Sequence, residues 1–277
     1  KNECWFEPTA ALVPGKDDTS RIIVTASQLN GMDIGPQLYT WTKDNGLTWS
    51  NPAQSQRLQV NPLAYDIFEK PWMSPWYHKS TNTTFMIGRT CFTQDILPSA
   101  GIKGETHAIW APKAQAQRKN LKPDLIFSRW NDEIGDFAPW ERISWQQAFD
   151  EPENINLFTS DVSQKVEMTD GEILIPVTVG REDAPASSAV LSVHWDGARL
   201  AADNVGNIMS CTDVRGFHEP SLIRHDGRYY MTIRNDLTGY VATSEDGLHY
   251  DEPKEWCFED GSSLESYNTQ QHWLAID

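Results

Sequence analysis

The sequence predicts an all-β fold assembled from repeated units of about 50 residues. No long stretch of the 277 residues has the periodicity of an amphipathic helix. Short apolar runs, separated by clusters of Gly, Pro, Asn and Asp, follow one another at the spacing of strands and turns. One pattern of residues also returns several times along the chain, which is typical of β architectures built from similar modules.

The apolar runs give the expected elements in order. We expect strands at 9–13, 21–26, 37–42, 84–87, 124–128, 173–179, 188–194, 229–233 and 239–243. Residues 144–149 are expected to form a short helical turn, and 95–120 form a long polar excursion between strands. Hydrophobic residues make up 39% of the chain, enough to bury a sizeable core.

Each repeated pair of strands is preceded by an acidic residue, often with a Pro close behind. These starts are Glu7-Pro8, Glu69 with Pro71, Glu167 and Glu219-Pro220, and a fifth begins at 266–274. A turn joins the two strands of each unit, and the second strand ends in a polar cluster.

Two segments, 42–49 (TKDNGLTW) and 244–250 (SEDGLHY), have the chemistry of tight hairpin turns. We expect Asp44 to accept backbone N–H groups, Gly46 to adopt a positive φ, and Trp49 to plug between neighbouring sheets. The alternative is that the two segments are unrelated hairpins of some other β-sandwich.

The first segment matches the Asp box, S/T-x-D-x-G-x-T-W, and the second is a shortened relative of it. With the repeated units, these turns make the chain resemble the sialidase-like (Asp-box, BNR repeat) β-propeller family over nearly its whole length. The resemblance implies four-stranded blades around a central channel, in a six-bladed ring. We expect blades at 4–52, 65–150, 160–205 and 215–258, and a fifth begun at 265. Residues 1–277 then form a single propeller domain that lacks a C-terminal portion.

In a propeller, the starts of first strands and the ends of second strands meet at one mouth of the channel. The first-strand starts supply Glu7, Glu69, His218, Glu219, Gln270, Gln271 and His272. The second-strand ends supply Gln28, Arg89, Arg181 with Glu182 and Asp183, and Arg234 with Asn235 and Asp236.

Three arginines at matching second-strand ends, Arg89, Arg181 and Arg234, indicate a receptor for an anionic group. Guanidinium groups bind carboxylate or sulfate through two parallel hydrogen bonds. We therefore expect them, with Asp183, Asp236, Gln271 and His272, to bind an acidic sugar. The alternative is that each Arg pairs with a neighbouring carboxylate and holds two blades together.

The carboxylates at the first-strand starts point to glycoside hydrolysis, which usually needs two carboxyl groups, one as acid and one as base or nucleophile. Glu219 and Glu7 (or Glu69) are the candidates, with His218 as a further proton-transfer group. The alternative is that Glu-Pro at a blade start is structural, its carboxylate accepting N–H groups of the adjoining loop.

The chain departs from the family at the Arg-Ile-Pro motif of the first inner strand, because Phe6-Glu7-Pro8 stands there instead. The family's nucleophile is a Tyr, and Tyr267 has no secure match. We therefore expect a glycosidase for a uronic, sialic-like or sulfated sugar. One alternative is a propeller-type polysaccharide lyase, which would use His218, Arg234 and a Tyr. Another is a binding propeller without catalysis, in which Trp5, Trp72 and Trp76 stack on sugars.

The net charge of −16 argues against nucleic-acid and membrane partners, because so acidic a surface repels phosphate groups. No calcium-binding run or metal-ligand spacing occurs, so we expect neither metal nor cofactor. The start at Lys1 without an apolar leader is expected of a trimmed or secreted chain, and we predict a secreted or periplasmic protein. The four cysteines are expected to be buried thiols, although spacing alone does not decide their pairing.

Overall fold

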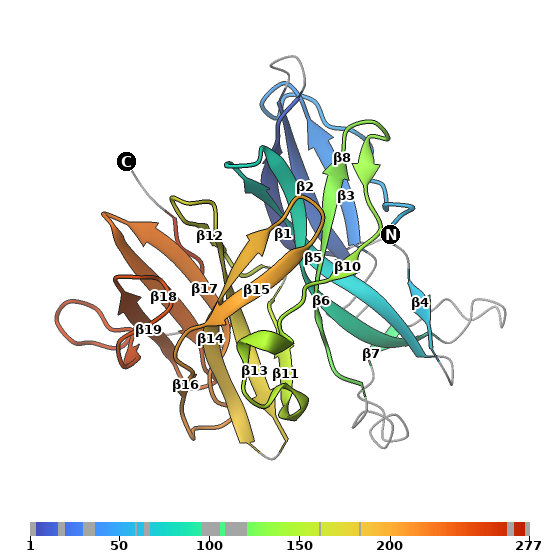
Figure 1. Ribbon diagram of the computed structural model, residues 1–277. Coiled ribbons are helices and arrows are strands. Elements are labelled where there is room, and N and C mark those ends of the chain that lie inside the picture. Colours follow the sequence, from blue (N-terminus) through green and yellow to red (C-terminus); the bar gives the residue numbers. More distant parts are fainter. Residues whose placement is uncertain are drawn as a thin grey trace. The chain divides into compact units, whose positions relative to one another are not determined.

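The computed structural model describes residues 4–15, 20–29, 37–58, 60–63, 67–95, 106–108, 121–160, 162–182, 184–264 and 269–274 (Figure 1). These residues form antiparallel sheets joined by turns, with two short 3-10 helices. The chain divides into two compact units, 1–142 and 143–277, and each contains two sheets. The single domain over 1–277 stays a prediction.

Unit 1 (1–142) contains a three-stranded and a seven-stranded sheet. The first sheet consists of β1 (Cys4–Val13), β2 (Arg21–Leu29) and β3 (Gln37–Thr42), and an isolated bridge adds Ala53 beside Tyr39. The second has the order β10 (Glu141–Arg142), β8 (Leu125–Asn131), β6 (Thr83–Asp95), β5 (Ile67–His78) and β4 (Asn61–Pro62). The short strands β7 (Thr106–Ala108) and β9 (Asp136–Phe137) pair with β6 and β8.

Unit 2 (143–277) contains a six-stranded and a four-stranded sheet. The first has the order β11 (Ile155–Phe158), β13 (Ile173–Arg181), β14 (Ala184–Trp195) and β15 (Leu200–Val205), with β12 (Val166–Glu167) on β13 and β16 (Met209–Ser210) on β14. The second has the order β17 (His218–His225), β18 (Arg228–Arg234), β19 (Gly239–Ser244) and β20 (Lys254–Glu255). The 3-10 helices η2 (Gln146–Ala148) and η3 (Pro152–Asn154) precede β11.

Eight of the nine expected strand segments lie wholly within strands, and the ninth, 124–128, starts one residue before β8. The expected helical turn at 144–149 contains η2. The third repeat, however, starts earlier than predicted. Its first strand begins at Ile155, leaves the sheet after Phe158 and resumes at Val166, so both pieces pair with β13. Glu167 therefore lies opposite Ile173, at the end of β13 away from Arg181, and is not a strand-start residue. The interruption occurs because the intervening polar side chains bond elsewhere, for example Ser160 to Gln270.

The expected fifth repeat is not formed as a strand in residues 269–274, which have no regular structure. Residues 265–268, which include Tyr267, lie outside the described residues, as does most of the excursion at 95–120. The segment at 270–273 is nevertheless anchored. The Gln164 side chain donates to the Trp273 carbonyl (2.9 Å), and Ser160 donates to Gln270 (2.9 Å).

Each unit buries its own apolar core. In unit 1 the core residues are Val13, Ile23, Met73, Met86, Ile126, Trp130 and Phe137. In unit 2 they are Leu174, Val190, Met209, Phe217, Leu222, Tyr229, Met231, Ile233, Ala242 and Tyr250. The first seven residues of β13 are all buried, as expected of a strand covered on both faces. The cores thus hold the strands rigidly and leave the strand ends to carry polar side chains.

A turn centred on an Asp carboxylate follows β3, β14 and β19, in three of the four sheets that the structure describes. Asp44 Oδ1 accepts the Thr48 N–H (2.8 Å), and hydrogen bonds from the Thr48 hydroxyl and N–H lower the pKa of Asp44 to about 2. Asp246 accepts the N–H groups of Leu248 and His249 (2.8 and 2.7 Å). Asp196 accepts the N–H groups of Ala198 and Arg199 (2.8 and 2.7 Å). The sequence motif did not predict this third turn.

The predicted role of Trp49 is wrong. Its side chain is 47% exposed, and its Nε1 donates to the Gly46 carbonyl (3.1 Å), so the indole covers its own turn instead of filling a space between sheets. Gly46 does adopt a positive φ of 88°. In the second turn, Tyr250 takes the buried position and is 6% exposed.

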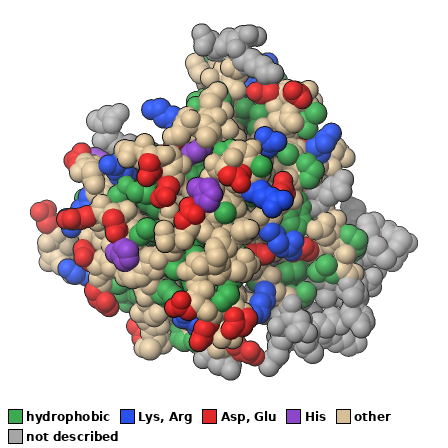
Figure 2. Space-filling model, in the orientation of Figure 1, with side chains coloured by type: hydrophobic (Ala, Val, Ile, Leu, Met, Phe, Trp, Pro, Cys, Tyr) green, Lys and Arg blue, Asp and Glu red, His purple; other side chains and the backbone are tan. Residues whose placement is uncertain are grey.

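Acidic side chains are spread over the visible surface with smaller groups of basic side chains among them (Figure 2). Within the described parts of the chain, no helix has the length and apolarity needed to cross a membrane. Cys91 is buried, Cys211 is partly buried and Cys257 is exposed, so the expectation of buried thiols is wrong for Cys257.

Candidate functional site

A cluster of charged side chains lies at one end of β17 and β18 in unit 2. His218 begins β17 and pairs across the sheet with Arg234, the last residue of β18. Strand β17 starts opposite the end of β18, so the β17–β18 hairpin itself brings His218 and Arg234 together. This local arrangement is the one that the repeat pattern predicted.

The backbone at Glu219 is strained. The register of β17 against β18 shifts between His218 and Ser221, and Glu219 has a φ of 50°. A non-glycine residue in this left-handed region is disfavoured and persists only where its surroundings hold it. The Glu219 N–H donates to the Thr178 hydroxyl (2.9 Å) on β13, so the neighbouring sheet supplies part of that hold.

Unit 1 repeats this feature at Glu7. The register of β1 against β2 shifts between Phe6 and Thr9, and Glu7 has a φ of 52°. Pro follows the strained Glu in both units. Glu69 does not share the feature, because β5 pairs with β6 without a register shift.

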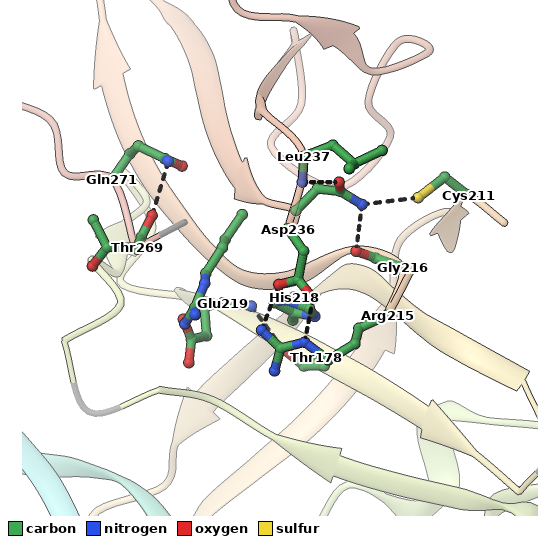
Figure 3. Close-up of polar contacts among 12 residues, drawn as sticks. Thr178, Cys211, Arg215, Gly216, His218, Glu219, Asp236, Leu237, Thr269 and Gln271 are labelled. Carbon is green, nitrogen blue, oxygen red and sulfur yellow. Dashed lines mark hydrogen bonds and ion pairs between the residues drawn. The ribbon is translucent and has the colours of Figure 1, made fainter. Parts of the chain in front are cut away.

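Two ion pairs organise the cluster in unit 2 (Figure 3). Arg234 Nη1 donates to Glu219 Oε2 at 2.5 Å, and the two side chains are 21% and 23% exposed. Arg215 binds both oxygens of Asp236, through Nε (2.6 Å) and Nη2 (2.5 Å). Opposite charges held this close at a strand end form a fixed polar surface.

Arg215 is a residue that the sequence analysis missed. It lies three positions before β17, outside the strand starts to which the repeat pattern points. Its signal in the sequence is the basic side chain just upstream of Gly216, at which the chain turns with a φ of 85°.

His218 lies among these charges and is 7% exposed. Its Nε2 is 3.6 Å from Asp236 Oδ1 and has no hydrogen-bond partner in the described part of the chain. Burial lowers the pKa of His218, and the positive charge of Arg215 lowers it further. The imidazole is therefore held neutral and can accept a proton.

The C-terminal segment brings Gln271 to the same end of the hairpin. The Gln271 carbonyl accepts a hydrogen bond from the Thr232 hydroxyl (3.3 Å). The Gln271 side chain packs beside Gly239, which pairs with Arg234, so closely that a Cβ atom added to Gly239 would lie 3.3 Å from Gln271 Nε2. Burial lowers the pKa of the His272 imidazole, and the positive charge of Lys165 lowers it further. Gln271, but not His272, is drawn with the cluster in Figure 3.

Arg181 ends β13 opposite Ile155, as expected of a second-strand end, and its side chain is exposed. Asp183 lies outside the described residues, and the side chain of Gln28 is also not described. Within unit 2, the structure thus gathers His218, Glu219, Arg234 and Asp236, to which Arg215 and Gln271 are added.

The predicted site residues of unit 1 have other surroundings. Arg89 pairs with Trp72 across the sheet, and its guanidinium carbon lies 5.2 Å from the centre of the Trp72 ring. Glu69 is 5% exposed and accepts hydrogen bonds from Arg142 (2.6 Å) and Asn61 (3.4 Å). The partners of the Glu69 carboxylate are thus side chains, not the loop N–H groups of the structural alternative, and its catalytic role stays a prediction.

The tryptophans expected to stack on sugars differ in exposure. Trp5 is 44% exposed, whereas Trp72 is only 7% exposed and has no open ring face to offer a sugar. Trp76 lies near the β5–β6 turn, at the opposite end of the hairpin from Glu69, and stacks on His78. Among the residues that the structure describes, no three His, Cys, Asp or Glu side chains are grouped to hold a metal ion.

No protein-family model matches the chain, and no curated protein matches it. Solved structures do match. A Hadza microbial sialidase has a TM-score of 0.58 at 13% identity, over 91% of this chain and 46% of its own. The NanB sialidase of Streptococcus pneumoniae has a TM-score of 0.58 at 9% identity, over 96% and 53%. A Trypanosoma rangeli sialidase has a TM-score of 0.52 at 14% identity, over 90% and 38%.

These likenesses show the fold: the chain has the architecture of a sialidase-like β-propeller, with four sheets as its blades. The chain spans about half the length of the first two sialidases and 38% of the third.

Proposed function

We propose that this protein is a secreted or periplasmic glycoside hydrolase whose substrate is an anionic sugar or polysaccharide, and that the cluster at the end of β17 and β18 is part of its active site. The observation that carries the proposal is the meeting of Arg234, Glu219 and His218 at a strained strand start. Strained backbone of this kind is concentrated at functional sites, where precise placement outweighs stability.

The arginines of the cluster each pair with a carboxylate, Arg234 with Glu219 and Arg215 with Asp236, and an acidic ligand would compete with these carboxylates for the guanidinium groups. Arg234 and Arg215 have side chains that are 21% and 57% exposed, so both can be reached from solvent. A planar guanidinium recognises a carboxylate or sulfate through paired hydrogen bonds. Arg234 lies beside the candidate catalytic groups, and we assign it to the acidic group of the sugar.

The acid–base chemistry is assigned to Glu219 and His218. Arg234 donates a hydrogen bond to the Glu219 carboxylate and so fixes its position, and we assign this carboxylate the role of base or nucleophile. Neutral His218 can accept or pass on a proton. Asp236 is a second carboxylate in the same cluster, and Glu7 has the matching backbone conformation in unit 1.

A substrate panel tests the proposal. The purified protein is incubated with oligosaccharides that carry sialic acid, uronic acid or sulfate and with their neutral analogues, and the release of reducing ends is measured. We expect turnover of at least one acidic substrate and none of its neutral analogue. Turnover of neutral substrates alone would contradict the assignment of Arg234.

A lyase is the second candidate, and the neutral, buried His218 next to Arg234 favours it, because a lyase removes the proton beside a carboxylate. Its product gains a double bond conjugated with the carboxylate and absorbs at short ultraviolet wavelengths, whereas a hydrolase product does not. A protein that only binds sugar would show ligand-dependent fluorescence changes without any product.

A further inference from the structure

A polar cleft is formed by residues of unit 1. Its volume is about 560 Å³. We call it the β4–β10 cleft, because its walls come from these two short strands and the segments beside them. Its lining residues are Gln56, Arg57, Asn61, Pro139, Trp140, Glu141 and Arg142.

One wall of the cleft is fixed before any ligand arrives. Arg142 donates to Glu69 (2.6 Å) and to Asp124 (3.0 Å), and its guanidinium lies over the Trp140 ring, 5.6 Å from the ring centre. Asn61 donates to the same Glu69 carboxylate at 3.4 Å. Binding to groups already held in place costs little conformational entropy, which favours affinity.

The charges of the β4–β10 cleft do not favour an anion. Arg142 already contacts two carboxylates, those of Glu69 and Asp124. The other lining charges, Arg57 and Glu141, have opposite signs. A carboxylate or sulfate entering the cleft would therefore meet no net positive field.

The same lining suits a ligand rich in hydroxyl groups. The guanidinium and amide groups of Arg57, Gln56 and Asn61 can donate hydrogen bonds, and the amides and Glu141 can accept them. The Trp140 indole adds a flat apolar surface. A few polar groups around an aromatic surface are the usual composition of a small-molecule site.

We propose that the β4–β10 cleft binds a neutral sugar unit. The inference goes beyond the proposed catalytic function and does not depend on it, because the cleft is built from unit 1 alone.

A binding experiment with four proteins tests it. Wild type and the variants Arg57→Ala, Trp140→Ala and Arg228→Ala are applied to an array of neutral and acidic oligosaccharides, and the neutral hits are titrated by calorimetry. We expect wild type and Arg228→Ala to bind the same neutral oligosaccharides. Arg57→Ala should weaken that binding by about tenfold, the loss of one or two hydrogen bonds.

Arg228→Ala, at an exposed position in unit 2, is the matched control for loss of an arginine and should bind like wild type. Trp140 packs against the unit 1 core, so the Trp140→Ala result is interpreted only with an unchanged circular dichroism spectrum. Arg57 is exposed, and Arg57→Ala tests the cleft without this concern. The proposal is overturned if no neutral oligosaccharide binds, or if Arg57→Ala binds as tightly as wild type. Failure of the hydrolase assay leaves these outcomes unchanged.

Discussion

Glu7 and Glu219 share one backbone conformation, although 212 positions separate them in the chain. Both have a φ close to +50°, both lie at a register shift in a first strand, and both precede Pro. Among described non-glycine residues with positive φ, the other four (Asn45, Asn82, Val214 and Asp226) lie in turns. Two glutamates inside strands are therefore held in a conformation that a strand does not require.

The strain at these positions can be measured by comparing two substitutions at each. Gly accepts a positive φ and Ala does not, and both remove the carboxylate. We expect Glu7→Gly to be more stable than Glu7→Ala by about 1 kcal/mol in urea denaturation, and Glu219→Gly to exceed Glu219→Ala by a similar amount. Glu252, an exposed residue outside the strands, provides the control pair. Equal stabilities of the Gly and Ala variants would show that the conformation is not strained.

The assignment of Glu219 predicts a loss of turnover in Glu219→Gln. The amide keeps the size of the side chain but cannot act as base or nucleophile, so kcat should fall about a hundredfold or more. Binding of the acidic substrate, measured by calorimetry, should persist. Glu252→Gln should have wild-type kcat. An active Glu219→Gln variant would remove Glu219 from the mechanism.

The ion pair of Glu69 predicts a purely structural effect. Arg142→Ala leaves the buried Glu69 without a main partner, and we expect a loss of about 1 to 3 kcal/mol in the free energy of unfolding. Arg57→Ala should have almost no effect on stability.

In Glu69→Gln we expect turnover to be retained, which enzyme assays at equal folded concentration can check. Loss of turnover there would restore Glu69 as a catalytic candidate.

The charge of Arg215 predicts a change in the titration of His218. Arg215 lowers the pKa of this imidazole, so Arg215→Ala should raise it, and the freed Asp236 carboxylate should add to the rise. The pKa is followed by the chemical shifts of the imidazole protons in NMR spectra. Arg228→Ala is expected to leave the titration unchanged. A pKa that falls or stays constant in Arg215→Ala would contradict the described contacts.

Protein stability should also depend on His218. Its pKa is lowered in the folded state, so the unfolded chain binds the proton more readily. The stability that neutral His218 contributes is full above about pH 6.5, the ordinary pKa of His. It is lost as the pH falls from there through the lower pKa that His218 has in the folded protein. Arg215, Arg234, Glu219 and Asp236 all act on this imidazole. Urea midpoints of wild type should therefore fall between about pH 7 and pH 5 more steeply than those of His218→Gln.

The fold could largely be predicted from the sequence because its signals are local. Alternating apolar runs give strands, and the chemistry of Asp44 and Asp246 gives turns. The start of the third repeat was missed, since the sequence around Ser160 does not show that its side chain bonds to Gln270, 110 residues away. The exposure of Trp49 was missed because the indole finds its hydrogen bond within its own turn.

The candidate site was predicted only where a hairpin fixes the distance. His218, Glu219 and Arg234 meet because β17 and β18 are paired. Arg215 and the partners of Glu69 could not be foreseen, because Arg215 approaches from a loop and Arg142 from β10, outside the strand pair that holds Glu69. Ion pairs of this kind depend on tertiary contacts that no short pattern encodes.

On acidification, histidine side chains should become charged well before the carboxylates at the centres of the Asp44 and Asp246 turns are protonated. Asp44, with a pKa of about 2, keeps its negative charge and its hydrogen bonds at acidities where imidazoles are already cationic. The Asp44 turn should thus keep its geometry while the cluster around His218, at the end of β17 and β18, gains positive charge. Mild acid should therefore act on stability through the region around His218, while the hydrogen bonds of the Asp44 turn persist.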